Sequence, residues 1–145
     1  MSQDHFQKLE QMYLKAPINS NHYPGSQINI SQGEAIVSLD VDEDYFHALN
    51  GVHGSVYFKL LDDAAFFAVN SLVTDYFVLT TSFNINLIRP VSKGLLTATG
   101  SVRFKSRNLF TAESVLKNES GKEIAFGTGN FTASRVELSS IESYR

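Results

Sequence analysis

The 145-residue chain contains no cysteine, which excludes disulfide bonds, thiolate metal sites and cysteine nucleophiles. It also lacks an apolar run approaching the ~20 residues of a membrane-spanning helix, because Lys59, Asp62 and Asp63 interrupt the longest apolar stretch. The first residues carry neither the basic start nor the apolar run of a signal peptide. We therefore expect a cytoplasmic protein that does not bind membranes.

The chain also has fewer basic than acidic residues, 12 against 15, and its formal net charge is -3 at pH 7. An acidic chain of this kind is unsuited to general nucleic-acid binding, and any anionic ligand must be met by a local patch. The histidines show no metal-ligand spacing to one another or to carboxylates, so we predict no metal site. The length suits one domain, residues 1–145, and is too short for two ordinary ones.

Two adjacent carboxylates, Asp62 and Asp63, lie within the otherwise apolar stretch 55–69, which is typical of a buried helix. A charged carboxylate there is costly unless it is paired, hydrogen-bonded or shifted in pKa. At about 100° per residue, Asp62 shares its face with Phe58, whereas Asp63 lies above Lys59. Both carboxylates could simply form ion pairs; alternatively, Asp62 is functional and Asp63 structural.

The apolar periodicity changes along the chain in a way that predicts the order of the elements. Spacings of three and four predict a short N-terminal helix over residues 2–15, and Pro17 ends it. Alternation from Gln27 to Val41 predicts a hairpin that turns at Gly33. A long helix should begin near His53 or Gly54 and end around 70–75.

Four strand-like runs follow this helix, and we expect them to form an antiparallel meander. The first run should place Phe77, Leu79 and Phe83 on one face. The last, about 123–132, contains two glycines that suggest a bend or bulge. The polar tail 135–145 is expected to fray. The predicted class is α+β, with a curved antiparallel sheet of about six strands wrapped around one long central helix.

One segment carries a recognisable motif. The run from His47 to Ser55, with Asp62 nine residues after His53, resembles hotdog-fold acyl-CoA thioesterases of the phenylacetic-acid-degradation type. Their motif is Asn-x-x-Gly-x-x-His-Gly-Gly, with an Asp eight residues after the first Gly of the final pair. The similarity extends through the strand that ends at Arg89-Pro90 and covers about residues 27–133.

The resemblance implies specific roles for three residues. Asp62 would be the catalytic carboxylate, acting either as general base or as nucleophile. The backbone N–H of Gly54, at the positive end of the helix dipole, would bind the thioester oxygen. Thr80 corresponds to a hydroxyl residue that orients the attacking water. No cofactor is implied, because CoA is part of the substrate.

The motif is also modified in two places. The family Asn corresponds to His47 and the middle Gly to Asn50, so either side chain could hold the thioester carbonyl region. His53 could be a structural residue hydrogen-bonded at the helix start or a proton-transfer group.

A basic segment lies on the strands after the helix, since no Asp or Glu occurs between Tyr76 and Ala112. Arg103, Lys105 and Arg107, with Arg89, are candidates for contacts with the phosphates of CoA. The alternative is a solvated sheet face whose charges discourage incorrect strand pairing.

The resemblance further implies a homodimer with shared active sites, in which the Asp62 helix of one subunit faces the Gly54 loop of the other. Pairs of such dimers also occur in the family. The leading interpretation is thus an acyl-CoA thioesterase that releases a carboxylic acid and CoA. The alternatives are a non-catalytic acyl-CoA-binding hotdog domain and a hotdog hydratase.

Overall fold

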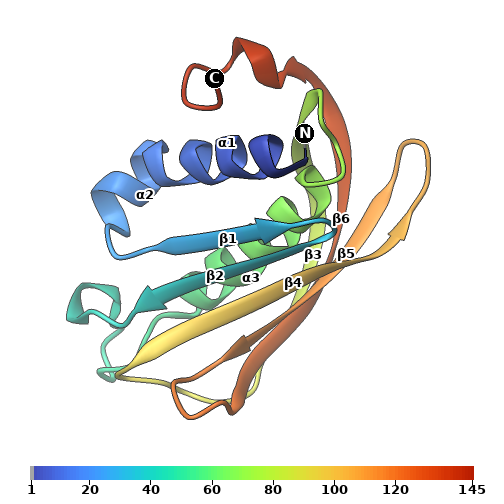
Figure 1. Cartoon of the computed structure of the whole chain (residues 1–145). Coiled ribbons are helices and arrows are strands. Elements are labelled where there is room, and N and C mark those ends of the chain that lie inside the picture. The colour runs from blue at the N-terminus through green and yellow to red at the C-terminus, as the bar shows by residue number, and fades with distance from the viewer. Residues whose placement is uncertain (1) are drawn as a thin grey trace.

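A single six-stranded antiparallel sheet curves around the long helix α3, Gly54–Asn70, as the sequence predicted (Figure 1). The computed structural model describes residues 2–145. The remaining elements are α1 Ser2–Lys15, α2 Pro17–His22, β1 Gln27–Ser31, β2 Glu34–Asp40, β3 Tyr76–Leu87, β4 Leu95–Lys105, β5 Phe110–Lys117, β6 Glu123–Glu137, and two 3-10 turns, Glu43–Tyr45 and Leu138–Ser140. The expected α+β class is confirmed.

The expected meander of four consecutive strands is wrong. The strand order is β1-β2-β4-β5-β6-β3, so β3 pairs with β6 at the far edge and only β4, β5 and β6 form a meander. The segment after β3 crosses one end of the sheet, where Ile88 and Arg89 donate backbone hydrogen bonds to Ile124 and Val52 donates to Val91. These bonds carry the chain across the sheet before β4 begins.

The two sheet edges differ. Helix α1 lies along β1 (Figure 1), and the Glu10 carboxylate accepts a 2.8 Å hydrogen bond from the backbone N–H of Ile30. At the other edge, β3 has no partner strand on its outer side within residues 2–145. One edge is therefore covered by a helix and the other is open.

The N-terminal region contains two helices rather than a helix and an irregular connector. Pro24-Gly25 is a turn signal, and the residues between Pro17 and this turn would be expected to form an irregular connector, but α2 occupies Pro17–His22. Pro17 ends α1 as expected and also begins α2, because proline suits the first position of a helix, where an N–H has no partner.

The C-terminal tail is ordered against the domain and not frayed. β6 continues to Glu137, beyond the predicted end at 132, and Leu138 is only 1% exposed. The Tyr144 hydroxyl lies 2.8 Å from Nδ1 of His5, which is itself buried. Two apolar side chains in a polar segment are thus sufficient to anchor the tail.

Close packing sets the position of α3 on the sheet. Gly100 on β4 faces the helix, and a Cβ added there would lie 2.4 Å from the backbone of Ala64. The helix can lie this close only because Gly100 has no side chain. Gly127, expected to mark a bend, instead makes room for the Phe83 ring, since β3 and β6 stay in register there.

The irregularity in this part of the sheet lies in β3. Thr80 pairs with Phe131 and Ser82 with Asn130, so Thr81 is an extra residue and forms a β-bulge. The bulge reverses the alternation predicted for the first part of the strand: Val78 is fully buried and Leu79 is 47% exposed. Thr80 consequently faces the helix.

Within residues 2–145, the structure contains no helix with the length and apolar character needed to cross a membrane.

Candidate active site

Asp62 and Thr80 meet between the middle of α3 and the bulge in β3. The Thr80 hydroxyl donates a 2.9 Å hydrogen bond to Oδ1 of Asp62. Thr80 can do so because the extra residue at Thr81 turns it toward the helix. Two residues that the sequence placed in one site, 18 positions apart, are in direct contact.

Asp62 is a carboxylate whose proton affinity is raised. The pKa of Asp62 is raised to about 6, mainly by burial and also by the neighbouring Asp63 carboxylate, whereas the Thr80 hydrogen bond and the Lys59 charge oppose the shift. A group with this pKa is mostly ionised at pH 7 and can still accept and return a proton.

Asp63 has a different environment, although it is the next residue. The Lys59 ammonium and the Tyr13 hydroxyl both donate to Oδ2 of Asp63, so the predicted pairing with Lys59 is confirmed. Lys59 also donates to Oδ1 of Asn19 at 2.7 Å. Burial raises the pKa of Asp63 despite these donors. The ion pair joins α1 and α2 to α3, and nothing in the sequence pattern pointed to Tyr13 or Asn19.

A groove of about 500 Å³ contains both carboxylates. Its wall combines one face of α3 with residues of the two N-terminal helices and of β3. The lining residues are Met12, Tyr13, Ala16, Ile18, Asn19, Tyr23, Ser55, Phe58, Lys59, Asp62, Asp63, Phe66, Phe67, Phe77 and Thr80. The groove is mainly apolar with a few polar groups, as small-molecule sites commonly are.

The N-terminus of α3 presents a free backbone donor. Within residues 2–145, no protein atom accepts from the N–H of Gly54. His53 is the N-cap, and its Nδ1 accepts from the Ser55 N–H at 3.0 Å and lies 2.8 Å from the Ser55 hydroxyl. This geometry matches the structural interpretation of His53. An unpaired N–H at a helix N-terminus can bind a developing negative charge.

His47 and Asn50 belong to the turn before this helix. The Leu49 N–H donates to Nδ1 of His47 at 3.1 Å, which leaves Nε2 as the protonated nitrogen of the neutral ring. Asn50 has a φ of 61°, in the left-handed region that Gly and Asn tolerate best. The backbone conformation therefore explains why Asn can stand where the motif has Gly.

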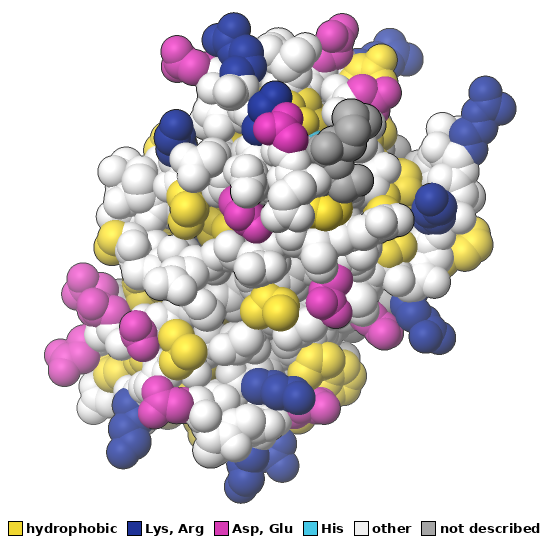
Figure 2. All heavy atoms as spheres, viewed as in Figure 1, with side chains coloured by type: hydrophobic (Ala, Val, Ile, Leu, Met, Phe, Trp, Pro, Cys, Tyr) yellow, Lys and Arg dark blue, Asp and Glu magenta, His cyan; other side chains and the backbone are white. Residues whose placement is uncertain are grey.

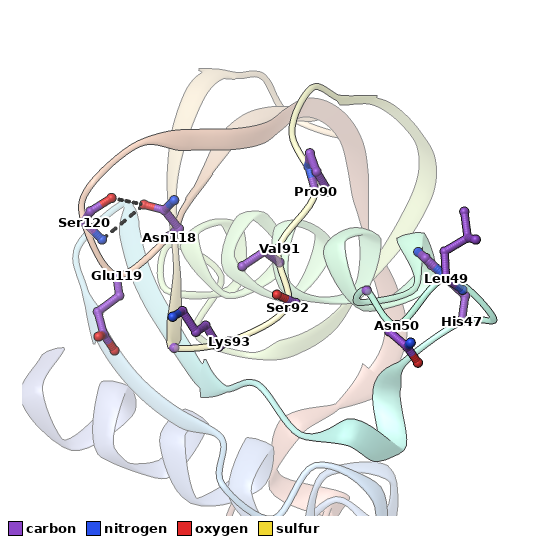
Figure 3. A pocket seen from close by; sticks show the side chains of 12 residues that line it. His47, Leu49, Asn50, Pro90, Val91, Ser92, Lys93, Asn118, Glu119 and Ser120 are labelled. Carbon is purple, nitrogen blue, oxygen red and sulfur yellow. Dashed lines mark hydrogen bonds between the residues drawn. The ribbon is translucent and has the colours of Figure 1, made fainter.

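A second, more open pocket of about 1060 Å³ lies beside this turn (Figure 3). Figure 3 shows His47, Leu49 and Asn50 on one side of it, the segment Pro90–Lys93 along its floor, and the turn at Asn118 opposite. Asn118 stabilises its own turn by accepting from Ser120, and Glu119 joins this turn to the start of β4 by accepting from the Leu95 N–H. The side chains of His47 and Lys93 donate to no protein acceptor within residues 2–145.

The predicted phosphate-binding residues are not brought to either pocket within one chain. Arg103 and Lys105 lie at the end of β4 that leads into the hairpin with β5, and Arg107 lies in its turn. Basic side chains protrude where this hairpin lies (Figure 2). The start of β4, beside the open pocket, is about 33 Å away along the strand. Arg89 donates to the Glu123 carbonyl at 2.6 Å.

No group of three or more His, Asp or Glu side chains within residues 2–145 is arranged to hold a metal ion.

Comparisons with known proteins point to one family. The sequence profile of the thioesterase superfamily matches residues 49–125, which include the motif from Leu49 onward, Asp62 and Thr80. A protein of Saccharolobus solfataricus, named as a candidate esterase, is 23% identical over 94% of this chain and 97% of its own length.

Solved structures show the same fold. The PaaI protein from the phenylacetic acid degradation operon of Escherichia coli superposes with a TM-score of 0.84 at 23% identity, over 94% of this chain and 97% of its own. A thioesterase from Haemophilus influenzae superposes with a TM-score of 0.78 at 18% identity, over 89% of this chain and 90% of its own.

Proposed function

Because the chain belongs to the thioesterase superfamily and has its hotdog fold, we propose that it hydrolyses an acyl-CoA thioester to a carboxylic acid and CoA. The observation that carries this proposal is the Asp62 carboxylate, which lies in an apolar groove, is held by Thr80 and has a pKa raised to about 6. A carboxylate in that setting is suited to taking a proton from water at neutral pH.

The chemistry requires two groups on opposite sides of the thioester carbonyl. Asp62 removes a proton from water as the water oxygen bonds to the carbonyl carbon, and the Gly54 N–H stabilises the resulting oxyanion. Collapse of this intermediate breaks the carbon–sulfur bond, and the proton held by Asp62 passes to the CoA sulfur. Thr80 occupies one oxygen of Asp62 and leaves Oδ2 for the water.

One chain cannot supply both groups to one thioester. Gly54 and Asp62 are eight residues apart on α3, which corresponds to about 12 Å along the helix axis. Water and oxyanion donor must both lie within about 3 Å of the same reacting group. We therefore propose a dimer in which Asp62 of one copy faces the Gly54 N–H of the second.

The open edge of the sheet is the surface that suits this pairing. β3 is long, lacks an outer partner and carries the residue that contacts Asp62. Antiparallel pairing of two β3 strands would continue the sheet from one copy into the other. It would also bring the Arg103–Arg107 hairpin of one copy to the same end of the joined sheet as the α3 N-terminus of the other, where CoA phosphates need cations.

The turn before α3 would complete the oxyanion side. We propose that Nε2 of His47 donates a hydrogen bond to the thioester carbonyl in place of the family Asn. Asn50 has a structural role, because its left-handed backbone conformation allows the turn before α3 to form. His53 acts as the helix cap.

Hydrolysis can be tested by following free thiol over short, long and aromatic acyl-CoAs, with Asp62→Asn beside the wild type. We expect release from at least one substrate and its near-complete loss in the variant, with the fold retained by circular dichroism. Tight acyl-CoA binding without thiol release over the whole panel would instead favour the non-catalytic interpretation. Hydration of crotonyl-CoA in preference to hydrolysis would favour the hydratase.

The shared site can be tested by mixing two inactive variants. Gly54→Pro removes the N–H without disturbing the helix start, because proline suits the first helical position and His53, at φ -64° and ψ 143°, has the extended conformation preferred before proline. Its added Cβ meets Leu87 Cδ1 at 3.1 Å, a contact that the Gly54→Ala control shares. Co-expression with Asp62→Asn should restore about a quarter of the wild-type activity, since half of the dimers are mixed and each has one intact site.

The matched control is Gly54→Ala, which keeps the N–H and should stay active. If the mixture remains as inactive as its two components, the two groups do not act across chains.

A further inference from the structure

The Asp62 groove runs along α3. Its α3 residues recur every three or four positions from Ser55 to Phe67, which makes one helical face. This face is about 18 Å long, and Asp62 lies about 10 Å from the Ser55 end and about 7.5 Å from the Phe67 end. A thioester held at Asp62 therefore divides the groove into two parts of unequal length.

The two parts differ in their access to solvent. The part beyond Asp62 ends against Met12 and Phe67, each 6% exposed, and Phe77. The part toward Ser55 is bordered by Ile18, which is 51% exposed. The CoA moiety carries several phosphates and needs contact with water. The acyl group must then point toward Met12 and Phe67.

The outer wall of the groove consists of α1, Ala16 and α2, and Tyr13 of α1 packs against Phe67 beside the acyl part. Met12, Tyr13, Ala16 and Asn19 line the groove opposite α3. The Lys59 bond to Asn19 and the Tyr13 bond to Asp63 hold these helices in place. The wall that faces the acyl group is thus a separate segment of chain, attached through a few polar contacts.

Within residues 2–145 of one chain, the groove offers no free cation to a charged acyl terminus. Lys59 is its only basic lining residue, and its ammonium already contacts Asp63 and Asn19. The other charged lining residues are Asp63, which is paired with Lys59, and Asp62. A second carboxylate on the substrate would therefore be buried beside like charges without a partner.

We propose that the groove between Asp62 and Phe67 is the acyl subsite, that the α1–α2 segment limits its length, and that it selects short, uncharged acyl groups. The inference rests on the proposed thioester hydrolysis. About 7.5 Å accommodates roughly six carbons at about 1.2 Å per bond of an extended chain.

The length limit can be tested with Ala16→Phe, which adds a ring to the α1–α2 wall. Measured as kcat/KM, activity on hexanoyl-CoA should fall by about tenfold or more, whereas activity on acetyl-CoA should change by less than about threefold. Leu14→Phe is the matched control, because Leu14 lies two residues before Ala16, in the last turn of α1, is exposed and does not line the groove. It should leave the chain-length profile unchanged.

Met12→Ala gives the opposite test, because it shortens a side chain at the closed end. Activity on decanoyl-CoA should rise relative to hexanoyl-CoA, provided that circular dichroism shows the variant folded. The charge selection is tested with two acyl groups of four carbons: succinyl-CoA should be hydrolysed at least about tenfold less efficiently than butyryl-CoA.

Any of three results would overturn this inference but not the proposed function. They are equal effects of Ala16→Phe and Leu14→Phe on kcat/KM for all chain lengths, an unchanged chain-length dependence in folded Met12→Ala, and equal kcat/KM for succinyl-CoA and butyryl-CoA. In each case wild-type hydrolysis that depends on Asp62 would leave the proposed function standing. Absence of hydrolysis for every acyl-CoA would overturn both.

Discussion

Asp62 and Asp63 are adjacent in the chain and chemically identical, yet the structure gives them opposite surroundings. Asp63 faces α1 and α2, where a lysine and a tyrosine donate to it. Asp62 faces β3 and the groove, where its one protein donor is the Thr80 hydroxyl. A 100° rotation about the helix axis thus separates a carboxylate that is neutralised from one that is not.

The difference teaches that burial alone does not mark a functional carboxylate. Asp63 and its partner Lys59 are 18% and 12% exposed, and their charges cancel inside the fold. Asp62 is half-buried but contacts no cation of residues 2–145, so the protein retains an unneutralised charge where a substrate can reach it. Such a charge is costly for stability and useful for proton transfer.

The largest expected effect is on activity, when each carboxylate is replaced by its amide. Asp62→Asn should lower kcat/KM by about 10²–10⁴-fold, because it removes the proton acceptor. Asp63→Asn should retain activity within about tenfold, since it alters only the support of the groove wall. Comparable losses in the two variants, with both folded, would contradict the assignment of catalysis to Asp62.

The same two substitutions should change stability in opposite directions. Asp63→Asn should lower the free energy of unfolding by about 3 kcal/mol, because Lys59 is left buried without its counter-charge. The double variant Lys59→Met, Asp63→Leu should recover much of this loss, since apolar side chains replace both charges. Urea unfolding at one protein concentration measures both values.

Asp62→Asn should instead stabilise the fold by about 1–2 kcal/mol at pH 7, a value reduced from the full linkage for partial solvent contact. The pKa of Asp62 is about 6 in the folded state and 3.8 when unperturbed, so ionisation disfavours the fold as pH rises through this range. The gain should accordingly disappear at pH 4. Equal stability of variant and wild type at both pH values would mean that burial does not raise the pKa of Asp62.

A smaller effect is expected on the pH dependence. Because Asp62 must be ionised to accept a proton, kcat/KM should rise with pH up to about 6 and then level off. Thr80→Val removes the hydrogen bond that lowers the pKa of Asp62, so the rise of kcat/KM with pH should move to higher pH. Thr80→Ser keeps the hydroxyl and serves as the control. If kcat/KM rises over the same pH range in the wild type and both variants, Thr80 does not affect the pKa of Asp62.

The comparison also shows where sequence reasoning succeeded. Local spacing separated the two aspartates correctly, because Lys59 stands four residues before Asp63 and a helix brings such residues together. The same periodicity located α3 and the β1–β2 hairpin. These features depend on residues that are near one another in the chain.

The features that were missed depend on distant residues. The pairing of β3 with β6, the bulge at Thr81 and the contact of Tyr144 with His5 leave no local periodic signal. Tyr13 and Asn19, which support the groove, lie 40 or more positions from Lys59 and Asp63.

The covered edge at β1 has a consequence for how far assembly can proceed. A sheet with two open edges can add copies of itself at both ends and grow into a fibre. Here α1 covers the β1 edge and Glu10 accepts from the Ile30 N–H, which leaves β3 as the only uncovered edge within residues 2–145. The proposed pairing through β3 would use this edge of each copy, and growth of the sheet would then stop at two chains.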